Sequence, residues 1–331
     1  MIKSSLTPAQ QFASPCCMAP PEDISRQPDP IAIPAPVATR VSVIVPARNA
    51  GNMIGACLDA LWNQTLPAAD WELIVVDNGS EDNTREVARE AGARVVSEKR
   101  PGVAQARQTG AENACGPLIA FTDADCRPNP DWLERLIAPL EANQEMAFCG
   151  GAILSPPPET VAEFYTTHRR VLDQEKFFGE PSPFSFPFFA TANAAFQLSA
   201  LRAVGGFDTA LPTTCEDADL CWRLQWAGFS GRYVADAVVF HHHRTDLRAL
   251  MRQVHRYGRG DAALLRKHRA RLEANAGKPL PRLDWRPLGW AMRAAPRVPF
   301  AAIFGRDAFE RRLPLYDFLC NLALLWGRLR G

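Results

Sequence analysis

The chain has 331 residues, of which 47% are hydrophobic and 22% are charged, and its formal net charge at pH 7 is +1. This composition is typical of a folded globular protein and excludes a largely disordered chain. No stretch reaches the length of about 20 apolar residues that a membrane-spanning helix needs, so we expect none.

Nine cysteines, at positions 16, 17, 57, 115, 126, 149, 215, 221 and 320, show no Cys-x-x-Cys spacing. An odd number of cysteines, mostly within apolar patterns, favours buried free thiols in a reducing cytosol. Residues 1–40 are rich in Pro, Gln and Ser and lack a continuous apolar core. We therefore expect a disordered Pro-rich tail there, and not a signal peptide.

Strand and helix patterns alternate from residue 41 to residue 155. Apolar and β-branched runs predict strands, and amphipathic segments predict helices. The expected strands are 41–45, 72–76, 94–96 and one ending at Asp123, and the expected helices are 53–62, 84–91 and 102–114. This alternation indicates an α/β fold with a mostly parallel sheet flanked by helices on both faces.

Polar segments follow three of these strands: Pro46 to Asn49, Asp77 to Ser80, and Asp123-Ala124-Asp125. Ligands of open α/β sheets bind beyond the carboxyl ends of the strands, so we expect the three segments to meet in one crevice. No Gly-x-Gly-x-x-Gly motif and no phosphate-binding loop motif is present, which disfavours a dinucleotide dehydrogenase and a phosphate-loop enzyme.

The two carboxylates of Asp123 and Asp125 come at the end of the apolar run 118–121. Carboxylates beside a buried strand need a cation or hydrogen-bond donors to offset their desolvation. A Mg²⁺ or Mn²⁺ ion that also binds substrate phosphates would meet this need. The alternative for such a motif alone is a solvated Asp-rich turn.

The second half of the chain is less regular. A helix is expected over 159–174, a strand over 188–196, a helix over 199–204 and another over 215–228. The segment 177–189 contains six Phe and three Pro, too many prolines for a continuous helix or central strand. It is either a mobile loop that closes over a ligand or an apolar surface patch. An apolar strand at 237–240 precedes His241-His242-His243.

Residues 244–331 contain 19 Lys and Arg against 7 Asp and Glu, a net charge of +12, and residues 1–243 carry −11. Arg244, Arg248, Arg252 and Arg256 recur every four residues, which places them on one face of an expected helix. This face suits anionic lipid headgroups or a phosphate-bearing acceptor, or it is simply solvated. The apolar segment 313–326 either lies in a membrane interface or docks on its own domain. No nucleic-acid-binding motif is present.

Six segments in order resemble the motif series of family 2 glycosyltransferases. They are 43–49, 75–80, 106–107, 123–125, 205–208 and 216–220 with Arg223. The resemblance covers about residues 41–243 and implies a GT-A catalytic domain that transfers sugar from a nucleotide diphosphate, usually with inversion. Residues 244–331, a helical basic and apolar region, match only through the Arg-Tyr-Gly-Arg-Gly pattern at 256–260.

The resemblance also implies roles for individual residues in donor binding. Pro46, Arg48 and Asn49 would shape the nucleotide pocket. Asp77 would accept a hydrogen bond from the base, with Arg107 nearby. The alternative for Asp77 is an Asx turn with Asn78 and Gly79, and for Arg107 a solvated helix position.

In the metal site that the resemblance implies, Asp123 would hold the ribose or the metal, beside Ala124. Asp125 would ligate Mn²⁺ or Mg²⁺ between the donor phosphates, and His241 would complete the site. The alternative for His241 is a surface or core histidine.

The general base of an inverting transfer would be Asp217, at an expected helix N-terminus where a carboxylate is favoured. A helix cap without chemistry is the alternative. Asn193, Glu216 and Arg223 would belong to the acceptor site and its loops, although Asp219 and Arg223, four residues apart, also suit an ion pair along the helix.

We therefore expect a cytoplasmic glycosyltransferase that adds single sugars to a hydroxyl acceptor. The acceptor is a glycan or glycolipid, lipid-linked or anionic, and the enzyme lies at the inner face of the membrane if the basic region binds anionic lipid. Membrane spans and a Gln-x-x-Arg-Trp motif are lacking, which disfavours processive synthesis. One alternative is a sugar-phosphate nucleotidyltransferase, disfavoured because residues 47–55 contain no lysine. The other is a catalytically silent nucleotide-sugar-binding protein.

Overall fold

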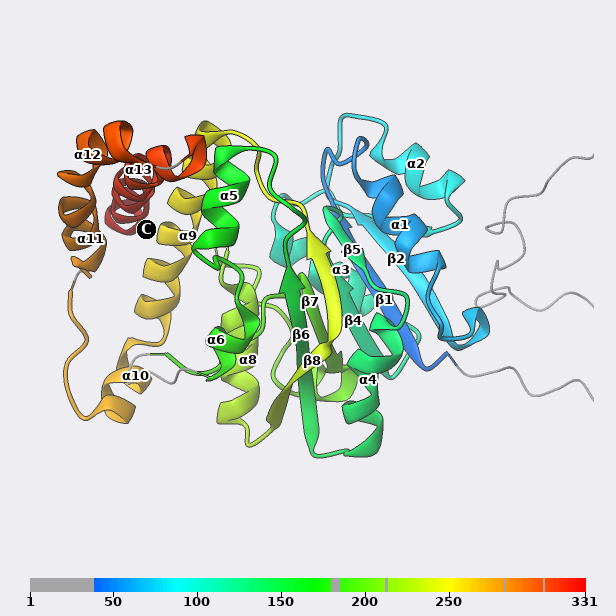
Figure 1. The fold of residues 1–331 in the computed structure, drawn as a ribbon. Helices are drawn as coiled ribbons and strands as arrows, with labels where there is room; N and C mark the ends of the chain where they lie inside the picture. Colours follow the sequence, from blue (N-terminus) through cyan, green and yellow to red (C-terminus); the bar gives the residue numbers. More distant parts are fainter. Residues whose placement is uncertain (1–38, 180–184, 212–213, 283, 306) are drawn as a thin grey trace, which may run out of the picture.

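The computed structural model describes residues 39–331 except 180–184, 212–213, 283 and 306 (Figure 1). The tail expected over residues 1–40 lies outside the described residues, apart from its last two positions, and so does the middle of the Phe- and Pro-rich segment 177–189.

A single eight-stranded sheet forms the centre of the molecule, in the order β3-β2-β1-β4-β7-β6-β8-β5. The strands are β1 Val41–Ala47, β2 Trp71–Asp77, β3 Arg94–Ser97, β4 Leu118–Thr122, β5 Cys126–Pro128, β6 Met146–Leu154, β7 Asn193–Gln197 and β8 Ser230–His241. β1 to β4 pair in parallel, as the sequence predicts. β7 runs antiparallel to β4 and β6, and β5 runs antiparallel to β8, so the complete sheet is mixed.

Helices cover both faces of the sheet. They are α1 Ile54–Trp62, α2 Thr84–Glu90, α3 Val103–Glu112, α4 Trp132–Ala142, α5 Val161–His168, α6 Gln174–Gly179, α7 Leu198–Ala203 and α8 Glu216–Trp226, with a 3-10 helix η2 at Ala68–Asp70. Because side chains alternate along a strand, β1 buries Val43 and Val45 on the face covered by α1 and α4, and Ile44 on the opposite face, covered by α3, α7 and α8. The sheet is therefore buried on both sides, and the polar segments lie at the ends of its strands.

Three expected elements differ clearly from their predicted bounds. The strand expected over 237–240 is only the end of the longer β8, which begins at Ser230. The helix expected over 159–174 ends at His168, because Arg170 takes a left-handed conformation (φ 50°) that interrupts it before α6 begins. The strand expected from residue 188 begins only at Asn193, where pairing with β4 starts.

After the sheet, five helices form a separate group at one side of the molecule, beyond α5 and away from β1 and β2 (Figure 1). They are α9 Leu247–Lys267, α10 Arg269–Ala276, α11 Arg286–Ala294, α12 Arg297–Phe304 and α13 Ala308–Arg330. The Asp246 carboxylate accepts a hydrogen bond from the backbone N–H of Ala249 and caps α9. Arg244 therefore precedes this helix, and only three of the four evenly spaced arginines lie on it.

α13 packs closely along α9. A Cβ atom at Gly258 would overlap the Leu324 carbonyl oxygen, and one at Gly327 would overlap that of His255, so these glycines allow the two backbones to touch. The apolar segment 313–326 lies within α13 and buries Tyr316 and Cys320 against α5 and α9. Within the described residues, no helix is both long and apolar enough to cross a bilayer.

Candidate active site

The loops after β1 and β2 are fastened to each other at the carboxyl edge of the sheet. The Asn49 backbone N–H donates to Ser80 Oγ at 3.0 Å, and Asn49 Oδ1 accepts from the Glu81 N–H at 2.9 Å. Asn49 adopts φ 50°, which asparagine tolerates better than most residues. Arg48 beside it is exposed and Pro46 is half-buried at the end of β1, so this loop reaches the crevice that the sequence predicts.

Asp77 lies buried at the end of β2. Its carboxylate accepts hydrogen bonds from the Ser80 N–H at 3.1 Å and from Arg85 Nε at 2.5 Å. Burial acts to raise the pKa of Asp77, but these bonds lower it on balance, so the group is ionised at neutral pH. The turn at 77–80 therefore contains the Asx-type hydrogen bond that was the alternative role for Asp77. A nucleotide base bound here would meet a carboxylate that is already paired with Arg85.

Asp125 and His241 come together through strand pairing. β5 and β8 are antiparallel, with Cys126 opposite His241, and the His242 N–H donates to the Asp125 carbonyl at 2.9 Å. His241 Nε2 consequently lies 3.5 Å from Asp125 Oδ1. Ligand atoms of Asp125, Cys126 and His241 lie within 4.8 Å of one another and form a group that can hold a metal ion.

The donor set fits a divalent cation. Asp125 Oδ1 and His241 Nδ1 are both buried and have no hydrogen-bond partner among the described residues. Burial raises the pKa of the Cys126 thiol well above its usual range, so this thiol stays protonated and is a poor ligand. Carboxylate oxygen and imidazole nitrogen remain, a combination that suits Mn²⁺ better than softer metals. Asp123 is not in the group, and its Oδ1 accepts a hydrogen bond from Arg107 Nη2.

Arg107 links two of the predicted motifs from its place on α3. It is buried, with a side chain only 6% exposed, so it is not the solvated helix residue that was its alternative. Its Nη2 donates to Asp123 Oδ1 at 2.8 Å, and its Nη1 donates to the carboxylate of Glu216. One guanidinium therefore fixes Asp123, in the turn after β4, relative to Glu216, at the start of α8, although the two are 93 residues apart in the sequence.

Glu216 and Asp217 open α8. The residue before them, Cys215, has φ 70°, an uncommon conformation for a side chain other than Gly or Asn, and it turns the chain sharply into the helix. Burial raises the pKa of both carboxyl groups above their ordinary values, and Arg107 opposes this shift. Glu216 is buried against Arg107. Asp217 is half-buried, and its Oδ1 accepts a hydrogen bond from the Ala218 N–H at 2.8 Å.

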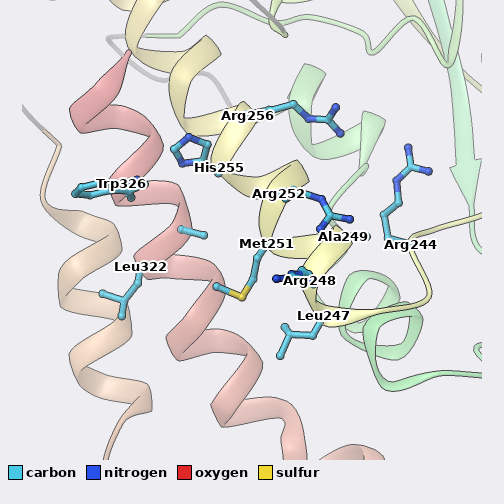
Figure 2. Close-up of a pocket in the computed structure, with 11 residues that line it drawn as sticks. Arg244, Leu247, Arg248, Ala249, Met251, Arg252, His255, Arg256, Leu322 and Trp326 are labelled. Atoms are coloured by element: carbon cyan, nitrogen blue, oxygen red, sulfur yellow. The ribbon is translucent and has the colours of Figure 1, made fainter. Parts of the chain in front are cut away.

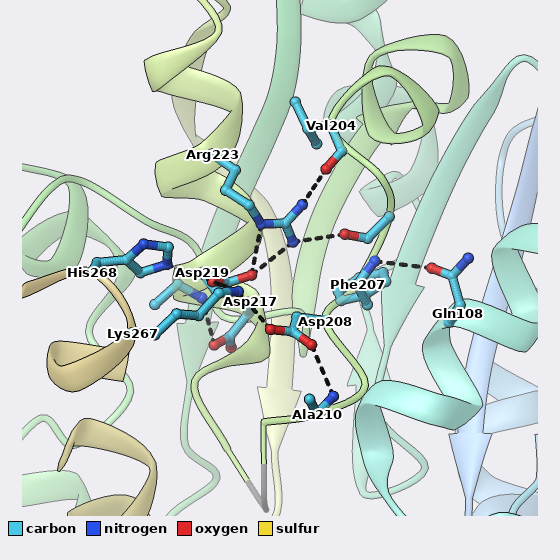
Figure 3. A network of polar contacts seen from close by, with 12 residues as sticks. Gln108, Val204, Phe207, Asp208, Ala210, Asp217, Asp219, Arg223, Lys267 and His268 are labelled. Atoms are coloured by element: carbon cyan, nitrogen blue, oxygen red, sulfur yellow. Dashed lines mark hydrogen bonds and ion pairs between the residues drawn. The ribbon is translucent and has the colours of Figure 1, made fainter. Parts of the chain in front are cut away.

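Asp219 and Arg223 form the ion pair along α8 that their spacing predicts, at 2.7 Å (Figure 3). Arg223 also donates to the carbonyls of Val204 and Gly206, both at 2.6 Å, and holds the glycine turn at 205–206 against α8. Lys267 and His268 contact Asp219 from the end of α9 at 2.5 and 2.6 Å. These contacts join the sheet region to the C-terminal helices and occupy Arg223, which was assigned to the acceptor site.

Asn193 is placed differently from its expected role. It is completely buried, its Oδ1 accepts from Trp132 Nε1 at 2.8 Å, and its Nδ2 donates to the carbonyls of Ala152 and Ala237 at 2.8 Å. With both ends of the amide engaged in the core, Asn193 cannot contact an acceptor and instead ties three strands together. Ala124, in the turn between β4 and β5, is buried.

Two residues near the carboxylates were not assigned individual roles in the site from sequence. Arg244 Nη2 lies 3.8 Å from Asp125 Oδ2. Tyr257, on α9, has its hydroxyl 3.0 Å from Gln253 Nε2. Burial raises the pKa of this hydroxyl, and the nearby carboxylates of Asp217 and Asp123 raise it further. The Arg-Tyr-Gly-Arg-Gly pattern was the signal that pointed to this segment.

Known proteins have sequences similar to that of this chain. The family model described as glycosyl transferase family 2 matches residues 42–205. Glycosyltransferase AglE of Haloferax volcanii is 30% identical over 230 residues, which covers 66% of this chain and 72% of that protein. The pre-mycofactocin glycosyltransferase of Mycobacterium tuberculosis is 31% identical over 235 residues, and the match covers 69% of this chain but 48% of that protein.

A solved structure extends the similarity to the fold. The mannosyltransferase PcManGT of Pyrobaculum calidifontis, in complex with GDP-Man and Mn²⁺, has a TM-score of 0.59 at 21% identity, covering 96% of this chain and 92% of that chain. The fold is therefore GT-A-like, as the motif series implied. The chain belongs to glycosyl transferase family 2.

Proposed function

We propose that this protein is a metal-dependent inverting glycosyltransferase that moves one sugar from a nucleotide-diphosphate donor to a hydroxyl acceptor. The observation that carries the proposal is the convergence of Asp123, Asp125 and Asp217 beyond the strand ends, with His241 beside Asp125 and Arg107 between the two motifs. Membership in the family supports a transferase and speaks against the nucleotidyltransferase alternative.

Asp125 and His241 would hold Mn²⁺ or Mg²⁺, which would bind the donor diphosphate and offset the charge that builds on the departing nucleotide. The loop at 48–49 and the turn at 77–80 would enclose the base. Asp123, held by Arg107, would face the ribose. The related fold of PcManGT, crystallised with GDP-Man and Mn²⁺, is the reason to include GDP among the nucleotides tested.

In the transfer step the acceptor hydroxyl oxygen bonds to the anomeric carbon on the side opposite the nucleotide. The bond from that carbon to the diphosphate oxygen breaks, and its electron pair leaves with the nucleoside diphosphate. The hydroxyl proton passes to the carboxylate of Asp217. Because burial raises the pKa of Asp217, this carboxylate accepts the proton more readily than a solvated aspartate would.

The direct test is isothermal titration of the full chain with UDP, GDP and CDP, each with and without Mn²⁺. We expect one nucleotide to bind tightly and only with the metal. Absence of binding by all three would contradict the donor site. Binding without any release of nucleoside diphosphate from the matching sugar nucleotides would favour the silent binding protein.

Two substitutions separate donor binding from chemistry. Asp125→Asn should weaken Mn²⁺-dependent nucleotide affinity by about 100-fold or more, because it removes a metal ligand. Asp217→Asn should keep donor affinity and lower turnover by about 10²- to 10⁴-fold, the usual contribution of a general base. Asp236→Asn, at a side chain 80% exposed, is the matched control. Equal loss of donor affinity in the first two variants would show that Asp217 is not the base.

We also propose that residues 244–331 contact an anionic membrane surface from the cytosolic side. Of nine large apolar side chains that are exposed among the described residues, eight lie between residues 285 and 329. Residues 244–331, which include this segment, have a net charge of +12. Exposed Trp and Ile side chains beside arginines are typical of helices that lie in a membrane interface, which supports a lipid-linked or anionic acceptor.

A further inference from the structure

We propose that the groove between α9 and α13 binds the acceptor as a single phosphorylated lipid, with its phosphate on the arginines of α9 and its apolar chain against α13. This inference rests on the proposed transferase function and names the acceptor class for it. The groove has a volume of about 1200 Å³, enough for a ligand larger than an ordinary metabolite.

The two walls of the groove differ in chemistry (Figure 2). Arg248, Arg252 and Arg256 extend from α9 on the side of Arg244, whereas Leu322 and Trp326 come from α13. Leu247 and Met251 continue the apolar lining between the two helices. A headgroup with negative charge and an apolar chain matches this division, and neither a neutral lipid nor a small anion would use both walls.

The arginines are available for an anion. In the part of the chain that the structure describes, the side chains of Arg248, Arg252 and Arg256 make no ion pair and no hydrogen bond. Other arginines of the same region are engaged: Arg328 pairs with Asp261 at 2.8 Å and with Asp284 at 2.6 Å. Three unpaired guanidinium groups on successive turns of α9 would bind a phosphate group through charge-assisted hydrogen bonds.

The groove is continuous with the proposed catalytic centre. Arg244 lines it and also lies 3.8 Å from Asp125, the proposed metal ligand. Tyr257, one residue after the last of the three arginines on α9, is near enough to Asp217 and Asp123 for their charges to raise the pKa of its hydroxyl. A phosphorylated lipid whose phosphate lies on these arginines would therefore bring a hydroxyl of its headgroup to the crevice, where the sugar is transferred, while its chain extends along α9 and α13.

The proposed lipid site on α9 can be tested without knowledge of the natural acceptor. Three probes are titrated into the full chain at physiological ionic strength, below their micelle concentrations: decyl phosphate, inorganic phosphate and decyl maltoside. Decyl phosphate should bind about tenfold more tightly than either of the others, because only it uses both walls. Equal affinity for inorganic phosphate would reveal a simple anion site, and equal affinity for decyl maltoside would reveal a purely apolar one. Either result would overturn the proposal.

Substitutions in the groove test whether decyl phosphate binds there. The combined substitution Arg248→Gln, Arg252→Gln and Arg256→Gln should lower decyl phosphate affinity by about tenfold or more. The control combines Arg293→Gln, Arg297→Gln and Arg312→Gln, which removes the same charge from exposed positions outside the groove. Trp326→Ala should weaken decyl phosphate and leave inorganic phosphate unchanged. Equal losses in the groove and control variants would mean that net charge alone attracts the lipid.

Mn²⁺-dependent nucleotide binding is measured on every variant. If nucleotides bind normally and decyl phosphate does not, the groove proposal fails and the transferase proposal stands. If nucleotides fail to bind to the unaltered chain, the transferase proposal fails on its own test. Thermal unfolding of each variant shows whether it is folded before its affinity is interpreted.

Discussion

Charges are arranged in opposite ways in the crevice and in the groove between α9 and α13. At the crevice, charged side chains are buried and paired: Arg107 lies between Asp123 and Glu216, and Asp219 is surrounded by Arg223, Lys267 and His268. In the groove, Arg248, Arg252 and Arg256 of α9 are unpaired among the described residues, and large apolar side chains are exposed nearby.

This difference separates two uses of charge. A buried pair sets positions, because removing one partner leaves the other without compensation in a medium of low polarity. An exposed, unpaired charge contributes little to stability and is free to bind a ligand. Substitutions in the crevice should therefore change the free energy of unfolding, and substitutions in the C-terminal surface should change binding alone.

The largest effect is expected at Arg107. Arg107→Met would leave the carboxylates of Asp123 and Glu216 without their shared cation, which should lower the free energy of unfolding by about 3–5 kcal/mol in urea titrations at pH 7. Because burial raises the pKa of Glu216, this residue can take up a proton, so the loss should shrink as the pH is lowered.

A double-mutant cycle provides the control for Arg107. Adding Glu216→Gln to Arg107→Met removes one of the two stranded charges and should recover part of the lost stability. A loss of less than about 1 kcal/mol in Arg107→Met, or no recovery in the double variant, would mean that Arg107 does not organise the crevice.

A smaller effect is expected at Asp219. Burial acts to raise its pKa, but hydrogen bonds from His268 and Lys267, with the charge of Arg223, lower it to about 2. A carboxyl group whose pKa is depressed in the folded state adds stability above its unfolded pKa, and this stability is lost as the pH falls toward the folded pKa. Asp219→Asn should therefore cost about 2 kcal/mol at pH 7.

The difference in stability between the unaltered chain and Asp219→Asn should decrease between about pH 5 and pH 2, as the pH falls through the unfolded and then the folded pKa of the carboxyl group. Denaturant titrations at several pH values measure this. Asp236→Asn, at an exposed side chain, should show no such trend. A difference that does not vary with pH would place the role of Asp219 in packing and not in charge.

Local patterns predicted much of the sheet region. β1, β2 and β4 are short apolar runs buried on both faces, and their polar ends meet as expected for parallel strands. The spacing of Asp219 and Arg223 also predicted their ion pair, because residues four apart are neighbours on a helix. In each case the information lies within a few residues of sequence or follows from a general rule of parallel sheets.

Contacts between distant segments could not be predicted in the same way. The pairing of Asp125 with His241 depends on β5, a strand of only three residues with no periodicity to reveal it. The buried amide of Asn193 was misassigned because the sequence does not show that it faces Trp132. Gly258 and Gly327 let α9 and α13 touch, and this close contact is a property of the pair and of neither helix alone.

The smallest change in stability is expected on the exposed apolar surface. Ile303, on α12, is 70% exposed, so Ile303→Ser should change the free energy of unfolding by less than about 0.5 kcal/mol. If this surface enters a membrane interface, the same substitution should lower affinity for phosphatidylcholine vesicles containing phosphatidic acid by roughly fivefold, or about 1 kcal/mol, through lost apolar burial. Leu154, at the end of β6, provides the control. Among the described residues, it is the one large apolar side chain that is exposed outside residues 285–329. Leu154→Ser should leave vesicle affinity unchanged, since Leu154 lies on the sheet region and outside the basic surface. Equal losses at both positions would show that apolar exposure alone drives vesicle binding, and no loss at Ile303 would remove α12 from the proposed membrane contact.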